Sequence, residues 1–272
     1  MQNILLAATL IGGAGLIIGI ILVVFSKIMA VPVNQAEQDI RELLPGANCG
    51  ACGYTSCDGY ASVLASGEES SVALCKPGGN STVEKLANYL GTDATEITAT
   101  TAVVMCQGDN SKTNKRANYQ GVKTCNMANL VAGGDGVCSF GCLGYGDCFE
   151  VCQYDAITIE DGLAKIDPYK CTSCMMCIEI CPKGIIELLP QHKASSLVLC
   201  HNEDPIKIAN KACKVSCISC RQCVRACPED CIEIKDNRAI IDYELCTNCG
   251  ECQKVCPHDC ILSLYPLVES SV

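Results

Sequence analysis

The stretch CTSCMMCIEICP, residues 171–182, decides the fold of this chain. Its three cysteines spaced three residues apart, followed by a Cys-Pro pair, form the bacterial ferredoxin run. Three thiolates in one tight loop bind a [4Fe–4S] cluster, and the fourth Cys binds the other cluster of a pair. The run recurs as CISCRQCVRACP (217–228) and as CTNCGECQKVCP (246–257). The spacing therefore predicts paired clusters that exchange ligands between runs.

An internal repeat with an offset of 75 residues, from Cys125 to Cys200, organises the C-terminal part of the chain. Nine cysteines of one copy match nine of the other without a gap. Between the Cys loops, AITIEDGLAKID (156–167) matches CIEIKDNRAIID (231–242). Each of these segments predicts two short strands joined by a polar turn. We expect two tandem ferredoxin-like modules, each a hairpin flanked by Cys loops.

Exchange of the fourth ligand assigns three regular clusters, one in the first module and two in the second. The predicted ligand sets are Cys171, Cys174, Cys177 and Cys152; Cys217, Cys220, Cys223 and Cys256; and Cys246, Cys249, Cys252 and Cys227.

The other cluster of the first module is irregular, because Tyr145 stands where the second module has Cys220 and Gln153 replaces the usual Pro. A ligand must come from elsewhere, and Cys138 is the nearest candidate. The alternative is that this run has lost its cluster, but four of its cysteines are retained. The predicted ligand set is Cys138, Cys142, Cys148 and Cys181.

A separate group of four cysteines precedes the modules: Cys49, Cys52, Cys57 and Cys75. Gly50 and Gly53 allow the chain to bend tightly beside these ligands. One further cluster fits here, which brings the expected number to five. We predict a helix over 34–44 before the group, with Asn34 as N-cap, and a helix from a capping box at 81–84 to about Leu90 after it. Residues 91–102 read as a linker.

Six cysteines remain. Cys231 and Cys260 occupy positions after Cys-Pro that usually carry a small apolar residue, so we expect both to pack in the core. The other four either bind a sixth cluster or are structural, and the second interpretation is slightly favoured. These four are Cys106, Cys125, Cys200 and Cys213.

Zinc is the main alternative metal, since paired C-x2-C elements also bind zinc through four thiolates. Zinc sites seldom use three Cys in one loop followed by Cys-Pro, and disulfide frameworks belong to short secreted chains. GCLGYG (141–146) lacks the spacing of a dinucleotide fingerprint. We therefore predict no catalytic residue, and a chain that carries electrons between other redox sites.

Charge limits the partners. The formal net charge is −10, which argues against binding to nucleic acid. Residues 205–228 nevertheless carry five basic residues and no acidic one. They either steer an acidic soluble electron carrier to the second module or form a solvated face. The five are Lys207, Lys211, Lys214, Arg221 and Arg225.

Residues 4–25 form an uncharged apolar run long enough to cross a membrane as a helix. A cleaved signal peptide is the alternative, but no basic region precedes the run and no convincing cleavage site follows. Lys27 and the metal-binding cysteines place the rest of the chain on the cytoplasmic side. Gly15 and Gly19 belong to a small-residue stripe, which indicates either membrane-embedded partner subunits or Gly tolerated in lipid.

The order of apolar helix, LLPGANCGACGYTSCDGYASVLASGEESSVALCKPGG (43–79) and ferredoxin modules ending in CTNCGECQKVCPHDC (246–260) closely resembles the B-subunit family of the Rnf complex, over essentially the whole chain. The resemblance implies a membrane complex that oxidises reduced ferredoxin, reduces NAD⁺ and exports Na⁺ or H⁺. It implies that this chain accepts electrons from soluble ferredoxin, alongside other membrane and peripheral subunits. The doubled ferredoxin region departs from the simplest family pattern, which has one two-cluster module.

The expected fold is α+β, with a single transmembrane helix, a small four-Cys domain and two ferredoxin-like modules. The expected boundaries are 1–26 for the anchor, 27–95 for the four-Cys domain, and 100–195 and 196–272 for the modules. A membrane-tethered polyferredoxin of a non-pumping oxidoreductase is the alternative function, and a zinc-stabilised interaction module is a third.

Overall fold

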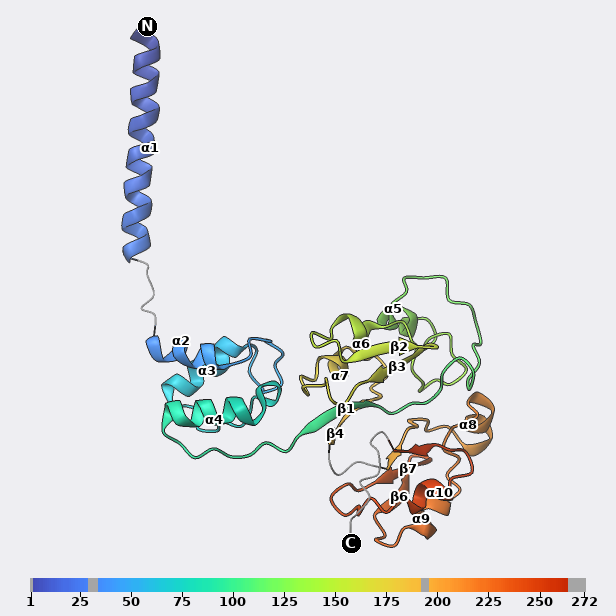
Figure 1. The fold of residues 1–272 in the computed structure, drawn as a ribbon. Helices are drawn as coiled ribbons and strands as arrows, with labels where there is room; N and C mark the ends of the chain where they lie inside the picture. The colour runs from blue at the N-terminus through green and yellow to red at the C-terminus, as the bar shows by residue number, and fades with distance from the viewer. Residues whose placement is uncertain (1, 29–33, 192–195, 264–272) are drawn as a thin grey trace.

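The computed structural model describes residues 2–28, 34–191 and 196–263 (Figure 1). Its first helix, α1 (Gln2–Ile28), has described side chains from Gly12 onward. Within the residues so described, no helix is long and apolar enough to cross a membrane. The predicted span at 4–25 lies partly outside these described side chains.

Three helices build the four-Cys unit: α2 (Gln35–Leu43), α3 (Cys57–Ser66) and α4 (Gly79–Leu90), with a 3₁₀ turn at Lys76–Gly78. The predicted N-cap of α2 is confirmed, since Asn34 Oδ1 accepts from the Ala36 amide at 3.1 Å. The predicted start of α4 is wrong, because its N-cap is Gly78 and the Ser81 hydroxyl donates back to the Gly78 carbonyl. Buried Ile40, Tyr60 and Leu86 hold the three helices together.

The first module contains two antiparallel strand pairs. Strand β1 (Thr100–Val104) pairs with β4 (Ile186–Pro190), and β2 (Ile157–Glu160) pairs with β3 (Leu163–Ile166). The β2–β3 hairpin confirms the prediction for 156–167, but the predicted linker at 91–102 is too long because β-branched residues from Thr100 onward enter β1. Three short helices carry the Cys loops: α5 (Cys125–Leu130), α6 (Asp147–Glu150) and α7 (Met176–Ile180).

The second module repeats this plan. Strand β5 (Leu197–Val198) pairs with β8 (Ile261–Leu262), and β6 (Ile232–Lys235) pairs with β7 (Arg238–Ile241), which confirms the second predicted hairpin. Its helices are α8 (Ile206–Ala212), α9 (Gln222–Ala226) and α10 (Glu251–Lys254).

A small apolar cluster joins the two modules, which lie side by side in Figure 1. Val103, Met105 and Leu189 come from the first module, and Leu197 and Leu199 come from the second. All five side chains are buried. Because burial of such side chains contributes roughly 1.5 to 3 kcal/mol each, the cluster fixes the modules against one another.

Candidate iron–sulfur sites

The four cysteines of the first group meet beside α3. Cys57 begins this helix behind the N-cap Ser56, and its amide donates to Asn48 Oδ1 at 2.9 Å. Gly50 and Gly53 take left-handed φ values of 76° and 88°, which turn the chain between the ligands. Burial raises the pKa of Cys75 to about 11, and the charges of the thiols at 57, 52 and 49 add to the rise. The predicted set of four is therefore brought together.

The regular set of the first module also converges. Cys152, Cys171, Cys174 and Cys177 all line one cavity of about 350 Å³. Burial raises the pKa of Cys177 to about 12, and the charges of the other three thiols contribute. The Ala102 amide of β1 donates to Cys171 Sγ at 3.4 Å.

The irregular site of the first module differs from the prediction. Its cavity of about 360 Å³ is lined by Cys142, Cys148 and Cys181 together with Cys125, and Cys138 is absent from the lining. Burial raises the pKa of Cys148 to about 12, and the charges of Cys142, Cys125 and Cys181 add to the rise. In the structure, Cys125 therefore lies at this cavity in the place predicted for Cys138 from the sequence.

Asp147 explains how Cys125 reaches this site. One carboxylate oxygen accepts from the Cys125 amide at 2.7 Å, and the other accepts from the Asn126 amide at 3.0 Å. These bonds hold the first turn of α5 against the start of α6. Tyr145, at the position of the missing ligand, instead donates its hydroxyl to Asp135 at 2.9 Å.

One set of the second module lines a cavity of about 340 Å³: Cys217, Cys220, Cys223 and Cys256. Buried Cys260 lies next to them, with its thiol within hydrogen-bonding range of the sulfurs of Cys217 and Cys256. A hydrogen bond with the Cys260 thiol lowers the pKa of Cys217 to about 6 or that of Cys256 to about 5, depending on which of the two sulfurs accepts its proton.

In the other set of the second module, Cys252 lies within electrostatic range of Cys246 and Cys249. The fourth member, Cys227, has its sulfur 3.4 Å from that of Cys231, which also lies beside Cys246. Cys231 and Cys260 are 6% and 1% exposed in the core, which confirms that they pack as small buried residues. Sequence reasoning missed that both also contact predicted ligands.

The backbone of the ferredoxin runs fits a bound cluster. In all three runs, the residues two and four positions after the first Cys have left-handed φ values between 51° and 74°. Five of these six residues are not Gly, and such a conformation costs about 1 to 3 kcal/mol each unless the surroundings hold it. The backbone of each loop therefore turns sharply between its cysteines. The six residues with left-handed φ values are Ser173, Met175, Ser219, Arg221, Asn248 and Gly250.

The sulfurs also have hydrogen-bond donors of the kind that iron–sulfur ligands use. The Asn248 amide donates to Cys246 Sγ and the Cys260 amide to Cys256 Sγ, each at 3.4 Å. Among residues 2–28, 34–191 and 196–263, no group of three or more Cys, His, Asp or Glu side chains is arranged to hold a single metal ion. The donor sets fit [4Fe–4S] clusters in thiolate chemistry and in loop conformation.

Three family models match the chain. The "Putative Fe-S cluster" family matches residues 44–77, the "4Fe-4S binding domain" family matches 164–187, and the "4Fe-4S dicluster domain" family matches 216–260. These ranges cover the first Cys group, one run of the first module and both runs of the second.

Curated relatives extend the match to most of the chain. In Acetobacterium woodii, the B subunit of the Na(+)-translocating ferredoxin:NAD(+) oxidoreductase complex is 42% identical over 90% of this chain and 73% of its own length. In Clostridium ljungdahlii, the B subunit of the proton-translocating ferredoxin:NAD(+) oxidoreductase complex is 34% identical over 90% of this chain and 86% of its own length. In Methanosarcina acetivorans, the B subunit of the ion-translocating oxidoreductase complex is 34% identical over 79% of this chain and 81% of its own length.

Proposed function

Because the chain belongs to the family of B subunits of ion-translocating ferredoxin:NAD(+) oxidoreductase complexes, and is an electron-transfer subunit of such a complex, we propose that it takes electrons from soluble ferredoxin at its second module. The electrons pass through the first module and the four-Cys domain toward the other subunits. The observation that supports this path most directly is the convergence of cysteines into separate groups of four along the chain.

Five [4Fe–4S] clusters supply the electron transfer, since each accepts and releases one electron at low potential. The thiolates of this chain hold them, and the amides beside the sulfurs stabilise the negative charge. The proposed ligand sets are Cys49, Cys52, Cys57 and Cys75; Cys152, Cys171, Cys174 and Cys177; Cys125, Cys142, Cys148 and Cys181; Cys217, Cys220, Cys223 and Cys256; and Cys227, Cys246, Cys249 and Cys252.

An exposed basic surface supports ferredoxin docking at the second module. It consists of five exposed residues on and around α8 and α9, beside the run that begins at Cys217: Lys207, Lys211, Lys214, Arg221 and Arg225. Ile206 and Ile208 of α8 are 50% and 54% exposed within it. Interfaces commonly combine apolar contacts with a charged rim, and complementary charge raises the association rate. An acidic ferredoxin fits this surface.

We also propose that α1 anchors the chain in the membrane as a single span, with the iron–sulfur domains on the cytoplasmic side. Every large apolar side chain described between Leu16 and Ile28 is exposed, which suits lipid contact. The apolar run at 4–25 contains no ionisable residue, so the ion path belongs to other subunits. The proposed divisions are 1–26, 27–95, 100–195 and 196–272.

The test replaces Lys207, Lys211 and Arg225 by Gln in the complete complex. Lys214, which donates to the Ser111 carbonyl, and Arg221, which lines the cavity of the Cys217 set, stay unchanged. We expect the rate of ferredoxin oxidation at low ferredoxin concentration to fall about tenfold at low salt. The wild-type rate should fall with added salt, whereas the variant rate should respond little.

The matched control replaces two exposed lysines outside the basic surface, Lys85 and Lys235, by Gln. It should keep the wild-type rate and salt dependence. A triple variant with the unchanged rate of the control would remove ferredoxin docking from this surface.

A further inference from the structure

A cavity of about 480 Å³ lies where the two modules meet, and four cysteines line it. These are the cysteines left over from the five proposed clusters, apart from the packed Cys231 and Cys260. The first module contributes Cys106 and Cys138, and the second contributes Cys200 and Cys213. We name these four cysteines the junction site. Its cavity is larger than the cavities of 340 to 360 Å³ at three of the proposed cluster sites.

The four sulfurs converge on this cavity. The Cβ position that Gly108 lacks would lie 3.6 Å from Cys106 Sγ and 3.5 Å from Cys213 Sγ, so two sulfurs from different modules flank one glycine. Cys138 lies within electrostatic range of the thiols of Cys106, Cys200 and Cys213. A Cβ at Gly108 would be in ordinary van der Waals contact with two of these sulfurs.

Amide groups surround these sulfurs as they do at the proposed clusters. The Gly108 amide donates to Cys106 Sγ at 3.3 Å, and the Cys217 amide donates to Cys200 Sγ at 3.3 Å. The side-chain amide of Asn202, which is 2% exposed, donates to Cys138 Sγ at 3.4 Å. The backbone amide of Val215 donates a hydrogen bond to the sulfur of Cys213. Such N–H donors stabilise thiolates bound to iron.

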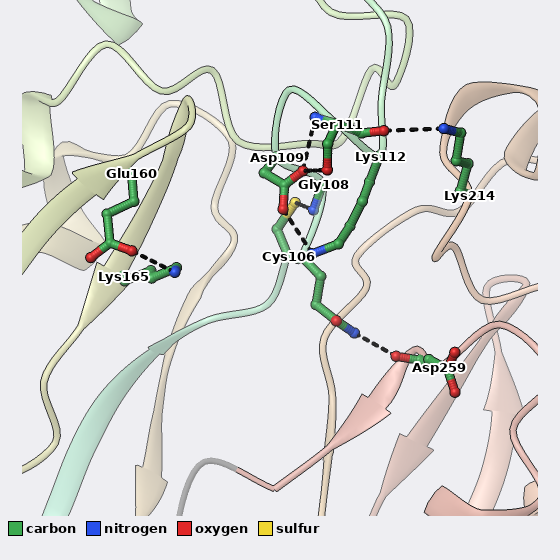
Figure 2. Close-up of polar contacts among 10 residues, drawn as sticks. Cys106, Gly108, Asp109, Ser111, Lys112, Glu160, Lys165, Lys214 and Asp259 are labelled. Carbon is green, nitrogen blue, oxygen red and sulfur yellow. Dashed lines mark hydrogen bonds and ion pairs between the residues drawn. The ribbon is translucent and has the colours of Figure 1, made fainter.

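The segment after β1 fixes the two halves of the site, as Figure 2 shows. Gln107 donates to the Asp259 carbonyl at 2.9 Å, and Lys214 Nζ donates to the Ser111 carbonyl at 3.2 Å. The Thr113 hydroxyl donates to the Ala212 carbonyl at 2.9 Å. These contacts between modules surround Cys106 and Cys213, so the site is part of the interface.

We propose that Cys106, Cys138, Cys200 and Cys213 hold a sixth [4Fe–4S] cluster, which passes electrons from the second module to the first. Two residues connect the junction site to its neighbours. The Cys217 amide contacts Cys200 Sγ, while the Cys217 thiol faces the second-module cavity. The Cys142 amide contacts Cys106 Sγ, while the Cys142 thiol faces the irregular site.

A cluster held by these four cysteines would accept one electron from the Cys217 set and pass the same electron to the irregular set. No atom or proton changes place. The direction of flow rests on the proposed function, whereas the presence of the cluster does not. The test therefore measures the cluster and the flow separately.

The cluster is tested by iron, acid-labile sulfide and zinc per full-length chain, purified without oxygen in detergent. We expect about 24 irons, four for each of six clusters. Cys138→Ser and Cys213→Ser should each lose about four irons, and the double variant should also lose about four, because both ligate one cluster. Cys125→Ser combined with Cys138→Ser should lose about eight, because these residues serve two clusters.

Ser139→Ala is the control, because Ser139 is an exposed neighbour of Cys138 that belongs to no proposed ligand set. It should keep all the iron. A loss limited to about four irons in each single Cys variant shows that the other clusters remain bound and that the variant folds. Wild-type protein with about 20 irons, or with one zinc and no loss of iron in Cys138→Ser, would overturn the sixth cluster.

The flow is tested in the complete complex by the ferredoxin:NAD⁺ rate. Cys138→Ser should lose most of this rate, while Ser139→Ala should keep it. Loss of four irons with an unchanged rate would overturn the relay role but not the cluster. A wild-type complex that does not oxidise ferredoxin would contradict the proposed function and leave the iron result standing.

Discussion

Removal of the Asp147 carboxylate tests how Cys125 reaches the irregular site. Asp147→Ala deletes the acceptors of the Cys125 and Asn126 amides, at 2.7 and 3.0 Å. Hydrogen bonds to a charged group contribute about 1.5 to 3 kcal/mol each, and loss of a helix cap costs about 0.5 to 2 kcal/mol. Because Asp147 is half-buried, we expect about 2 kcal/mol for opening of α5, which is roughly a 30-fold increase in the open population.

The assay is the rate of iron release to a chelator from anaerobic full-length protein. Opening of α5 frees Cys125, so about four irons should leave roughly 30 times faster than in wild type. Asp147→Asn keeps one acceptor oxygen and should give an increase of about fivefold, corresponding to roughly 1 kcal/mol. Glu150→Gln changes an exposed charge on the same short helix and should release iron at the wild-type rate. Equal rates for Asp147→Ala and Glu150→Gln would show that Cys125 does not depend on this contact.

Two further predictions concern the ferredoxin modules. Lys112, and next Ser111, hold the pKa of Asp109 below its usual range. The ionised carboxylate therefore stabilises the folded chain above its unfolded pKa of about 3.9. This stabilisation is lost as the pH falls toward the folded pKa. Asp109→Asn should therefore release iron faster than wild type at pH 7, with a gap that narrows below about pH 4, and an equally wide gap in acid would contradict the assignment. Gly144 and Gly250 share φ values of 72° and 74°, but a Cβ at Gly144 would meet the backbone of Gly162, whereas a Cβ at Gly250 meets nothing within 4 Å. Gly250→Ala should cost about 1 to 2 kcal/mol from its backbone conformation alone, and Gly144→Ala should cost clearly more, as measured by iron release; equal effects would exclude the steric contribution.

Local patterns in the sequence predicted local structure well. The hairpins at 156–167 and 231–242 have alternating apolar residues and turn residues with positive φ, such as Asp161 and Gly162, so neighbouring residues alone specify them. The pairing of β1 with β4 was not predictable in this way. Its partners Thr100 and Pro190 are far apart in the sequence, and no local signal marks one as the partner of the other.

The ligand sets show the same limit. Spacing predicted the three regular sets, whereas the fourth member of the irregular set was predicted from sequence proximity, which favoured Cys138 over Cys125. The repeat does not indicate Cys125 either, because its equivalent, Cys200, lines the cavity of the junction site instead. One usable signal was present: Ser56 caps the helix that begins at Cys57, and Thr124 caps the helix that begins at Cys125. In both cases a Ser or Thr N-cap directly precedes a Cys in the first turn of a helix, and that Cys lies at a proposed cluster site.

The strand pairing of the modules also orders the maturation of the chain on the ribosome. The four-Cys unit is complete once α4 ends at Leu90, but the first module closes only when Pro190 emerges to pair with Thr100. At about 5 to 20 residues per second, synthesis of the intervening segment takes on the order of 5 to 20 seconds. During that interval the thiols of the first module are open to solvent, and the second module repeats the delay until Leu262. Oxygen should therefore damage the chain more readily while it is being made than after both modules have closed.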